Sequence, residues 1–350
     1  MKGVCFAGVQ SVAWDSVEDP QLEATTDVIV QVDLAGLCGS DLHPYFGREQ
    51  GLDPGTVMGH EFVGRIVEKG SAVQRLNVGD RVYAPFSTSC GSCFYCQSGL
   101  TSRCQYGQLF GWRSHGRGLH GGQAEFVRVP LADGTLVRVP HELSNEICLL
   151  LGDNLSTGYF CADMAHVRPD QTVVVVGCGT VGLLGILAAQ WMQPRNIIAI
   201  DLNPHRRAKA LEFGVALALE PGEEALQQIH DATDGRGADC VMELVGLLDA
   251  QKFAMQTLRP GGVLSVIGCH STSHFAFSPV DAYDKNLTYR TGRCPARHYM
   301  EKLVVQANQS ALQLESLFTH RFQPSDAQRA YEIFSGQKEG CMKAVFDFQR

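Results

Sequence analysis

The chain has 350 residues, enough for two domains of ordinary size. Hydrophobic residues make up 45% of the chain and charged residues 19%, which excludes a disordered or low-complexity protein. The formal net charge of −8, without any basic cluster, argues against nucleic acids and other polyanions as partners.

The cysteine count and the apolar segments bear on the cellular compartment. Thirteen cysteines are an odd number in a chain too long to need disulfides, so at least one thiol is free. The first fifteen residues lack the pattern of an export signal. The uncharged stretch Thr172–Met192 resembles a membrane span, but glycines interrupt it, and we interpret it as a strand, a turn and a helix. We therefore expect a cytoplasmic protein without a membrane segment.

Short β-branched runs separated by turn residues fill residues 1–153 and predict a small all-β domain. These runs are Asp27–Leu34, Phe62–Lys69, Arg81–Ala84, Ala124–Val129 and Leu136–Val139.

A loop at about residues 90–104 of this domain carries four cysteines, spaced C-x2-C-x2-C-x7-C: Cys90, Cys93, Cys96 and Cys104. Four thiolates can close a tetrahedron around zinc and leave no open position, so the spacing predicts a structural zinc site. The alternatives are four unrelated thiols, which would rarely space themselves in this way, and an iron–sulfur cluster, whose usual ferredoxin spacings differ.

Strands and helices alternate over residues 154–290, which predicts a parallel, doubly wound sheet. The expected strands are Val173–Val176, Ile197–Asp201, Cys240–Leu244, Val263–Gly268 and Leu287–Arg290. Helices are expected at Gly182–Trp191 and Pro204–Phe213. In residues 291–350 we expect a helix at Ser325–Phe334 and a strand at Lys343–Phe348, in a segment that returns to the first domain.

A G-x-G-x-x-G motif follows the first of these strands at Gly177, Gly179 and Gly182. A strand before the motif and a helix after it form the context in which glycines cradle a dinucleotide pyrophosphate. Asp201 ends the next strand, where a carboxylate binds the adenosine ribose hydroxyls and repels a 2′-phosphate, so we predict NAD rather than NADP.

Two basic residues complicate this cofactor prediction, because an arginine near the strand end can accommodate a 2′-phosphate. Arg206 and Arg207 lie in the helix that Pro204 opens. We expect that helix to carry them away from the strand end unless a side chain folds back.

Cys38 in GLCGSDLH and His60 in GHEFVG suggest a second metal site. A catalytic zinc needs three protein ligands and an open position. On spacing alone, the alternative of two ordinary packed residues is the more frequent case.

The order of the motifs GLCGSDLH, GHEFVG, the four-cysteine loop, DNLSTGY, VVVVGCGTVG and CMKAVF resembles that of the zinc-containing medium-chain dehydrogenase/reductase family, the alcohol-dehydrogenase-like proteins. The stretch GLHGGQAEFVRVPLAD is similar to the formaldehyde-dehydrogenase-like branch. The resemblance implies an α/β protein with a GroES-like β-rich catalytic domain, a Rossmann domain and an active site in the cleft between them.

The resemblance also assigns catalytic residues. It implies Cys38 and His60 as ligands of a catalytic zinc, with Glu61 able to approach the metal, and it places Asp153 at the third-ligand position. The alternative for Asp153 is a helix N-cap. Ser40 and His43 resemble a proton relay; their alternatives are a turn-capping serine and a surface histidine. Further cofactor contacts are expected, or else plain strand-end packing, at Thr157, Thr180, Val181, Val245 and Cys269.

The function implied is a zinc-dependent alcohol dehydrogenase. It would transfer a hydride between a primary or secondary alcohol, or the matching aldehyde or ketone, and NAD, with two zinc ions per chain in a homotetramer or homodimer. A polyol or amino-alcohol dehydrogenase is an alternative, although such members often carry Glu in the third-ligand segment. A dinucleotide-sensing protein that retains the fold is a non-enzyme alternative. Both cysteine sets disfavour a zinc-free quinone reductase.

Overall fold

The computed structural model describes residues 1–268 and 273–349, and the chain divides into two compact units. The first unit comprises Met1–Ser156 and Pro295–Arg350, and the second comprises Thr157–Cys294. The sequence placed these two divisions after residues 153 and 290. The C-terminal segment thus packs with the N-terminal part of the chain, and each unit is considered below by itself.

The first unit is built on a sheet in the strand order β16-β17-β3-β4-β5-β9, with β8 also paired to β3. Its strands are β3 (Val28–Gly36), β4 (Phe62–Lys69), β5 (Arg81–Tyr83), β8 (Phe126–Val129), β9 (Val137–Arg138), β16 (Phe318–Phe322) and β17 (Lys343–Asp347). Two small hairpins accompany it: β1 (Lys2–Gly8) with β2 (Ser11–Ser16), and β6 (Trp112–Ser114) with β7 (Arg117–Leu119). The helices are short: α1 (Leu42–Tyr45), α2 (Phe94–Gln97), α3 (Ala132–Thr135), α4 (Asn145–Gly152), α11 (Ala296–Met300), α12 (Val304–Gln309), α13 (Ala311–Glu315) and α14 (Ala327–Ser335).

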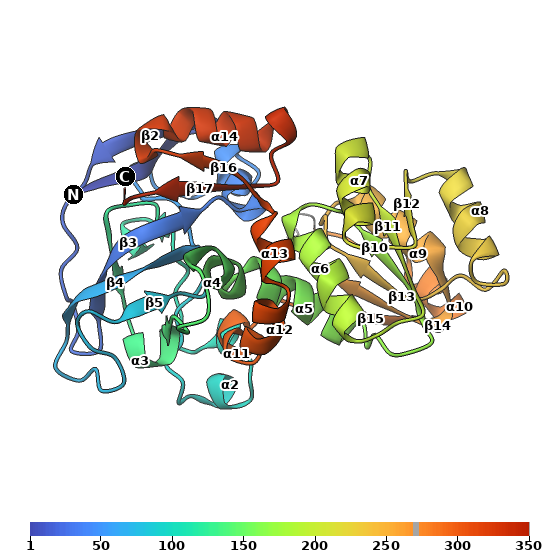
Figure 1. Cartoon of the computed structure of the whole chain (residues 1–350), viewed down its shortest axis with the longest axis horizontal. Coiled ribbons are helices and arrows are strands. Elements are labelled where there is room, and N and C mark those ends of the chain that lie inside the picture. Colours follow the sequence, from blue (N-terminus) through green and yellow to red (C-terminus); the bar gives the residue numbers. More distant parts are fainter. Residues whose placement is uncertain (269–272, 350) are drawn as a thin grey trace. The chain divides into compact units, whose positions relative to one another are not determined.

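Strand β3 organises this unit because it pairs with three other strands. Its apolar residues Val28, Val30 and Val32 are buried in a hydrophobic core of this unit. Near its end, β3 pairs antiparallel with β17, which brings the last strand of the chain beside the segment that leads to Cys38. Helix α14 packs on β2 (Figure 1). The β-rich unit and the returning C-terminal segment follow the expected architecture.

The second unit is a parallel sheet in the order β12-β11-β10-β13-β14-β15. Its strands are β10 (Thr172–Val176), β11 (Asn196–Ile200), β12 (Leu217–Leu219), β13 (Ala238–Glu243), β14 (Leu258–Val266) and β15 (Thr288–Thr291). Its helices are α6 (Thr180–Trp191), α7 (Pro204–Glu212), α8 (Glu223–Asp231), α9 (Leu248–Thr257) and α10 (Pro279–Asp284), and α5 (Asn154–Met164) leads into it from the first unit.

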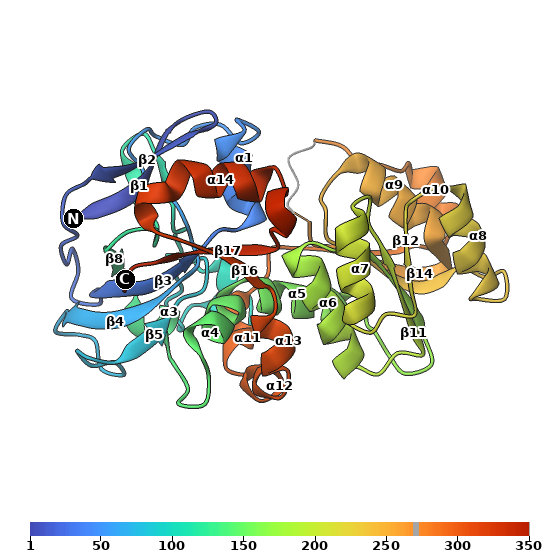
Figure 2. The same ribbon diagram turned by 45° about the horizontal axis from the view of Figure 1, so that its top comes forward.

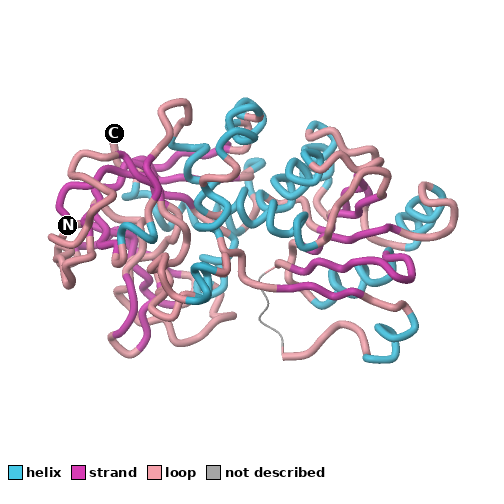
Figure 3. The backbone as a smooth tube through the Cα atoms, turned by 90° about the horizontal axis from the view of Figure 1, so that it is seen from below, coloured by secondary structure: helices cyan, strands magenta, loops and turns pink. Residues whose placement is uncertain are grey.

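Helices cover both faces of this sheet (Figures 2 and 3). Helices α6 and α7 pack against β10, β11 and β12, whereas α8 and α9 share a core with the other face of the sheet. The chain starts in the middle of the sheet at β10, winds outward through β12 and then returns to β13. This is the doubly wound arrangement expected from the sequence. The uncharged stretch Thr172–Met192 forms β10, the Gly-rich loop and α6, and α6 has 12 residues. None of the helices within the described residues has the length and apolarity to cross a membrane.

Candidate metal and cofactor sites

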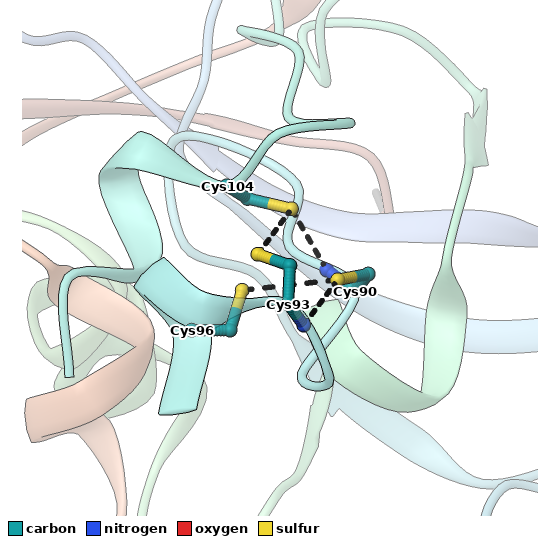
Figure 4. A group of neighbouring side chains, drawn as sticks. All are labelled: Cys90, Cys93, Cys96 and Cys104. Atoms are coloured by element: carbon teal, nitrogen blue, oxygen red, sulfur yellow. Dashed lines mark hydrogen bonds between the residues drawn. The ribbon is translucent and has the colours of Figure 1, made fainter. Parts of the chain in front are cut away.

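The four cysteines of the 90–104 loop converge on one point (Figure 4). The Sγ atoms of Cys90 and Cys96 lie 4.0 Å apart, as do those of Cys93 and Cys104. Zinc–sulfur bonds of about 2.3 Å at tetrahedral angles place sulfur atoms roughly 3.8 Å apart. The four side chains therefore fit a closed tetrahedral zinc site.

Hydrogen-bond donors of the same loop favour the thiolate form of Cys90. The amides of Ser92 and Cys93 donate to Cys90 Sγ at 3.4 and 3.3 Å, and the amide of Cys90 donates to Cys104 Sγ at 3.2 Å. Partial burial raises the pKa of Cys90, but hydrogen bonds from the Ser92 hydroxyl and from the amides of Ser92 and Cys93 outweigh it and lower the pKa to about 6. Burial instead raises the pKa of Cys96 to about 12 and also raises that of Cys104. A thiolate is the form that binds a metal.

Cys93→Ser is expected to lower the melting temperature and to release one metal ion per chain, because a structural metal contributes folding free energy. Metal analysis combined with thermal unfolding checks this. Ser98→Ala, an exposed change in the same loop, is the control. Wild-type stability and metal content in Cys93→Ser would contradict a structural zinc at this loop.

A second cluster gathers Cys38, His60, Glu61 and Asp153. Cys38 follows β3, His60 and Glu61 precede β4, and Asp153 lies between α4 and α5. Asp153 Oδ2 is 3.3 Å from Cys38 Sγ and 3.5 Å from His60 Nε2. Ligand atoms on one tetrahedral zinc lie roughly 3.3–3.8 Å apart, so these three side chains fit a shared zinc ion. The structure thus brings together the residues that the sequence proposed as ligands, and it aims the Asp153 carboxylate at the other two.

Asp41 orients two of these candidate ligands, and sequence reasoning did not find it. Its carboxylate accepts from the amide of Cys38 at 2.9 Å and lies 3.1 Å from His60 Nδ1. A carboxylate on one ring nitrogen leaves the other nitrogen free to face a metal. Burial alone would lower the pKa of His60, but Asp41 and Asp153 outweigh it and raise the pKa. The sequence feature that could have identified Asp41 is its position three residues after Cys38.

A buried lysine completes the surroundings of the second cluster. Lys343 of β17 is 0% exposed; it donates to Glu61, to Asn154 Oδ1 at 2.7 Å and to the Leu37 carbonyl at 3.0 Å. Asn154 Nδ2 in turn donates to Glu61 Oε1 at 2.8 Å and to Asp153 Oδ2 at 2.9 Å. These hydrogen bonds hold the Glu61 carboxylate in its position within the cluster. The motifs DNLSTGY and CMKAVF contain Asn154 and Lys343, but the sequence did not single out Asn154. From the sequence, Lys343 is expected to contact a cofactor phosphate or to lie on the solvated surface; its complete burial shows that the surface expectation is wrong.

The charges of this cluster favour a cation. Cys38, Glu61 and Asp153 are all buried, and the positive charge near them comes from Lys343 and, when no metal is bound, from the His60 ring. Burial, reinforced by the two carboxylates, raises the pKa of Cys38 to about 11. A divalent cation would offset the charge of a Cys38 thiolate and of the carboxylates, which is the physical requirement for keeping all three groups ionised in a buried site.

The two expected relay residues differ in their contacts. Ser40 Oγ donates to Cys38 Sγ at 3.2 Å and lies 3.2 Å from His60 Nε2, so its hydroxyl stands at the metal cluster. His43 lies in α1 and is half-buried; burial and Arg48 lower its pKa, so its ring is neutral at pH 7. Within the described residues, no hydrogen bond or ion pair joins the Ser40 and His43 side chains.

The Gly-rich motif connects β10 to α6. Gly177 has φ +95°, in the left-handed region that glycine favours. A Cβ on Gly182 would lie 1.8 Å from the carbonyl oxygen of Gly177, so only glycine fits there. Thr180 and Val181 form the first turn of α6, whose N-terminus therefore faces the loop. This arrangement leaves amide hydrogens available for an anionic ligand.

Asp201 and both arginines meet at the end of β11. Asp201 Oδ2 accepts from the amide of Cys178 in the Gly-rich loop at 2.7 Å. Both arginine side chains fold back to this strand end: Arg207 donates to the Asp201 carbonyl at 2.8 Å, and Arg206 approaches Asp201 Oδ2 at 4.0 Å. Both lie within the first turn of α7, close enough for long side chains to return. The expectation that the helix carries them away is therefore wrong for their charged groups.

The remaining expected cofactor contacts lie in three places. A Cβ on Gly177 would be 2.6 Å from Val245 Cγ2, so Val245 packs against the Gly-rich loop. Thr157 lies in α5, at the start of the second unit. Cys269 lies outside the described residues.

Known proteins match both units. The model for the alcohol dehydrogenase GroES-like domain matches residues 24–141, and the model for zinc-binding dehydrogenases matches residues 180–309. Zinc-type alcohol dehydrogenase B of Aspergillus flavus is 38% identical over 99% of this chain and 81% of its own length. The chain belongs to the zinc-containing medium-chain dehydrogenase/reductase family.

Two further members illustrate its range. The structure of alcohol dehydrogenase TADH from Thermus sp. ATN1 is 34% identical, with a TM-score of 0.92 over 99% of both chains. The NADP-dependent isopropanol dehydrogenase of Clostridium beijerinckii is 28% identical over 99% of both chains. Family membership confirms the expected GroES-like and Rossmann domains and identifies the chain as an oxidoreductase of the alcohol dehydrogenase type.

Proposed function

We propose that this enzyme transfers a hydride between a primary or secondary alcohol, or the matching aldehyde or ketone, and NAD. The observation that carries the proposal is the convergence of Cys38 Sγ, His60 Nε2 and Asp153 Oδ2, with the Ser40 hydroxyl beside them. Three protein ligands leave a fourth position open for substrate. The cluster at Cys90, Cys93, Cys96 and Cys104 would hold a second, structural zinc.

Zinc at the Cys38 cluster would stabilise the alkoxide of a bound alcohol and, in the reverse direction, polarise a carbonyl. Ser40, whose hydroxyl is 3.2 Å from both Cys38 Sγ and His60 Nε2, would accept the alcohol proton, and His43 would take it onward through an intervening group, because no hydrogen bond joins the two side chains in the described part of the chain. Asp41 keeps His60 oriented, and Lys343 with Asn154 holds Glu61 in place. The Gly-rich loop and the N-terminus of α6 would bind the cofactor pyrophosphate.

A cofactor-reduction assay over primary, secondary, aromatic and polyol alcohols tests this function. We expect the highest kcat/KM with a primary or secondary alcohol, and lower values with polyols. Zinc-loaded protein that reduces NAD or NADP with none of these alcohols would contradict the proposal. The cytoplasmic location and the dimeric or tetrameric assembly stay predictions from the sequence.

The expected preference for NAD over NADP rests on the negative charge of Asp201, and the positive charge of Arg206 beside it weakens that preference. We expect a higher kcat/KM for NAD than for NADP in the wild type. Asp201→Asn keeps an acceptor for the Cys178 amide but removes the charge, so it should raise the NADP to NAD ratio about tenfold. Glu212→Gln, which removes the exposed carboxylate paired with Lys209 at the other end of α7, is the control and should leave the ratio unchanged. A wild-type preference for NADP, or an unchanged ratio in Asp201→Asn, would show that Asp201 does not discriminate.

A further inference from the structure

A buried glutamate at the end of β13 has no role in the account so far. The side chain of Glu243 is 0% exposed. Its Oε1 atom accepts from the amides of Val245 and Gly246, both at 2.9 Å. Its Oε2 atom has no hydrogen-bond partner, and Glu243 forms no ion pair within the described residues. One carboxylate oxygen thus fixes two successive amides of the loop that follows the strand.

The loop that Glu243 fixes is tightly confined between two glycines. A Cβ on Gly177 would lie 2.6 Å from Val245 Cγ2, and one on Gly268 would lie 2.1 Å from the amide nitrogen of Gly246. Gly246 itself has φ +84°. Any displacement of Val245 and Gly246 would therefore disturb the Gly-rich loop on one side and the end of β14 on the other.

The place of this loop in the sheet indicates which ligand it faces. Strands β10 and β13 are neighbours, and Glu243 pairs in register with Val176, the last residue before the Gly-rich loop. The winding of the sheet reverses between these two strands, and ligands of such sheets bind at the carboxyl ends of the strands at that point. Asp201 lies on the β11 side of the Gly-rich loop, so Val245 and Gly246 lie on the opposite side, toward the other half of a bound dinucleotide.

We infer that Glu243 is a positioning residue for the nicotinamide half of the cofactor, acting through the amides of Val245 and Gly246. This inference rests on the proposed function. Glu243 need not touch the cofactor. Its carboxylate holds the backbone of Val245 and Gly246 at the position where this loop would contact the nicotinamide half of the cofactor. Charge-assisted hydrogen bonds are about twice as strong as neutral ones, so the charge on Glu243 matters as well as its shape.

The charge of Glu243 can change near neutral pH. Burial raises its pKa to about 7, although the two amides oppose the shift. The titratable groups that face it are the thiol of Cys161 on α5 and the hydroxyl of Tyr289 on β15, and burial, with a contribution from Glu243, raises the pKa of both. Both neighbours are therefore uncharged at neutral pH. As the pH falls through about 7, Glu243 gains a proton and holds the loop less firmly, so affinity for the nicotinamide half should fall.

The test compares NADH with AMP, which lacks the nicotinamide half, as probes of the full-length enzyme by titration calorimetry. Glu243→Gln should weaken NADH binding about tenfold at pH 8 and leave AMP binding unchanged. Between pH 8 and pH 6, the ratio of the NADH to the AMP dissociation constant should rise in the wild type and stay flat in the variant.

Asp239→Asn is the matched control, because it removes a carboxylate from the other end of β13, where Asp239 accepts from Thr172 and pairs with Arg259. It should lower thermal stability without changing NADH affinity. Equal NADH affinity in wild type and Glu243→Gln, or an equal loss of NADH and AMP affinity, would overturn the inference. If Glu243→Gln does not fold, a wild-type ratio that is constant with pH would overturn it. A wild type that binds neither probe would instead overturn the proposed function.

Discussion

Asp153→Asn is expected to lower turnover at least about 100-fold and to weaken metal retention, while cofactor binding stays nearly intact. The neutral amide is a poor zinc ligand, and the carboxylate of Asp153 faces both Cys38 Sγ and His60 Nε2. The binding residues of the Rossmann unit are not altered by the change. Kinetics, metal analysis and a cofactor titration on one preparation check all three expectations.

The same variant separates the two roles considered for Asp153. Asparagine caps a helix about as well as aspartate does, so a pure capping role predicts wild-type turnover and metal content in Asp153→Asn. Asp133→Asn is the control: it alters a carboxylate of the same unit that accepts from the amides of Gln74 and Arg75 and is not one of the grouped metal ligands. That control should keep its metal and its activity.

Ser40→Ala is expected to lower turnover about 100-fold, the scale of a positioned proton-transfer group. The Ser40 hydroxyl stands 3.2 Å from both Cys38 Sγ and His60 Nε2, so its loss removes the proposed proton acceptor from the metal cluster. His43→Ala should cost less, because water can replace an outer relay group. Steady-state kinetics over a range of pH measures both effects.

Conservative rescue distinguishes a relay from a structural serine. Ser40→Thr keeps a hydroxyl at the same position and should retain most of the activity that Ser40→Ala loses. Both variants should keep wild-type metal content, since Ser40 is not among the grouped ligands. Wild-type turnover in Ser40→Ala would remove Ser40 from the proposed relay.

Local patterns carried most of the fold prediction. The limits of β4 were predicted as the structure has them, and β10, α6 and β11 lie within two residues of their predicted limits, because β-branched runs and the Gly-rich motif mark their ends. The hairpin of β1 and β2 was not among the predicted strands, because the first fifteen residues were considered only as a possible export signal. The residue at the turn of this hairpin, Gln10, has φ +59°. Strand β12 was not predicted either, because its three residues are too few for an alternation of apolar and polar side chains to be recognised.

Long-range contacts explain what the sequence could not provide for the site. Lys343 and Glu61 are 282 residues apart in the chain, and nothing in either motif indicates that they meet. Asp41 acts through hydrogen bonds to Cys38 and His60, which depend on the folded loop. The return of Arg206 and Arg207 to Asp201 depends on side-chain conformation, which a helical pattern does not specify. Motif order led to the candidate ligands, whereas the groups that orient them required coordinates.

The most direct test of the two-zinc account is elemental analysis of the active enzyme before and after treatment with a mild chelator. The account predicts two zinc ions per chain, with one at the Cys38 cluster removed first, because its fourth position is open. Turnover should disappear with that first ion, while the circular dichroism spectrum and the metal of the four-cysteine loop persist. Fully active enzyme that contains one zinc ion per chain, or none, would contradict the account.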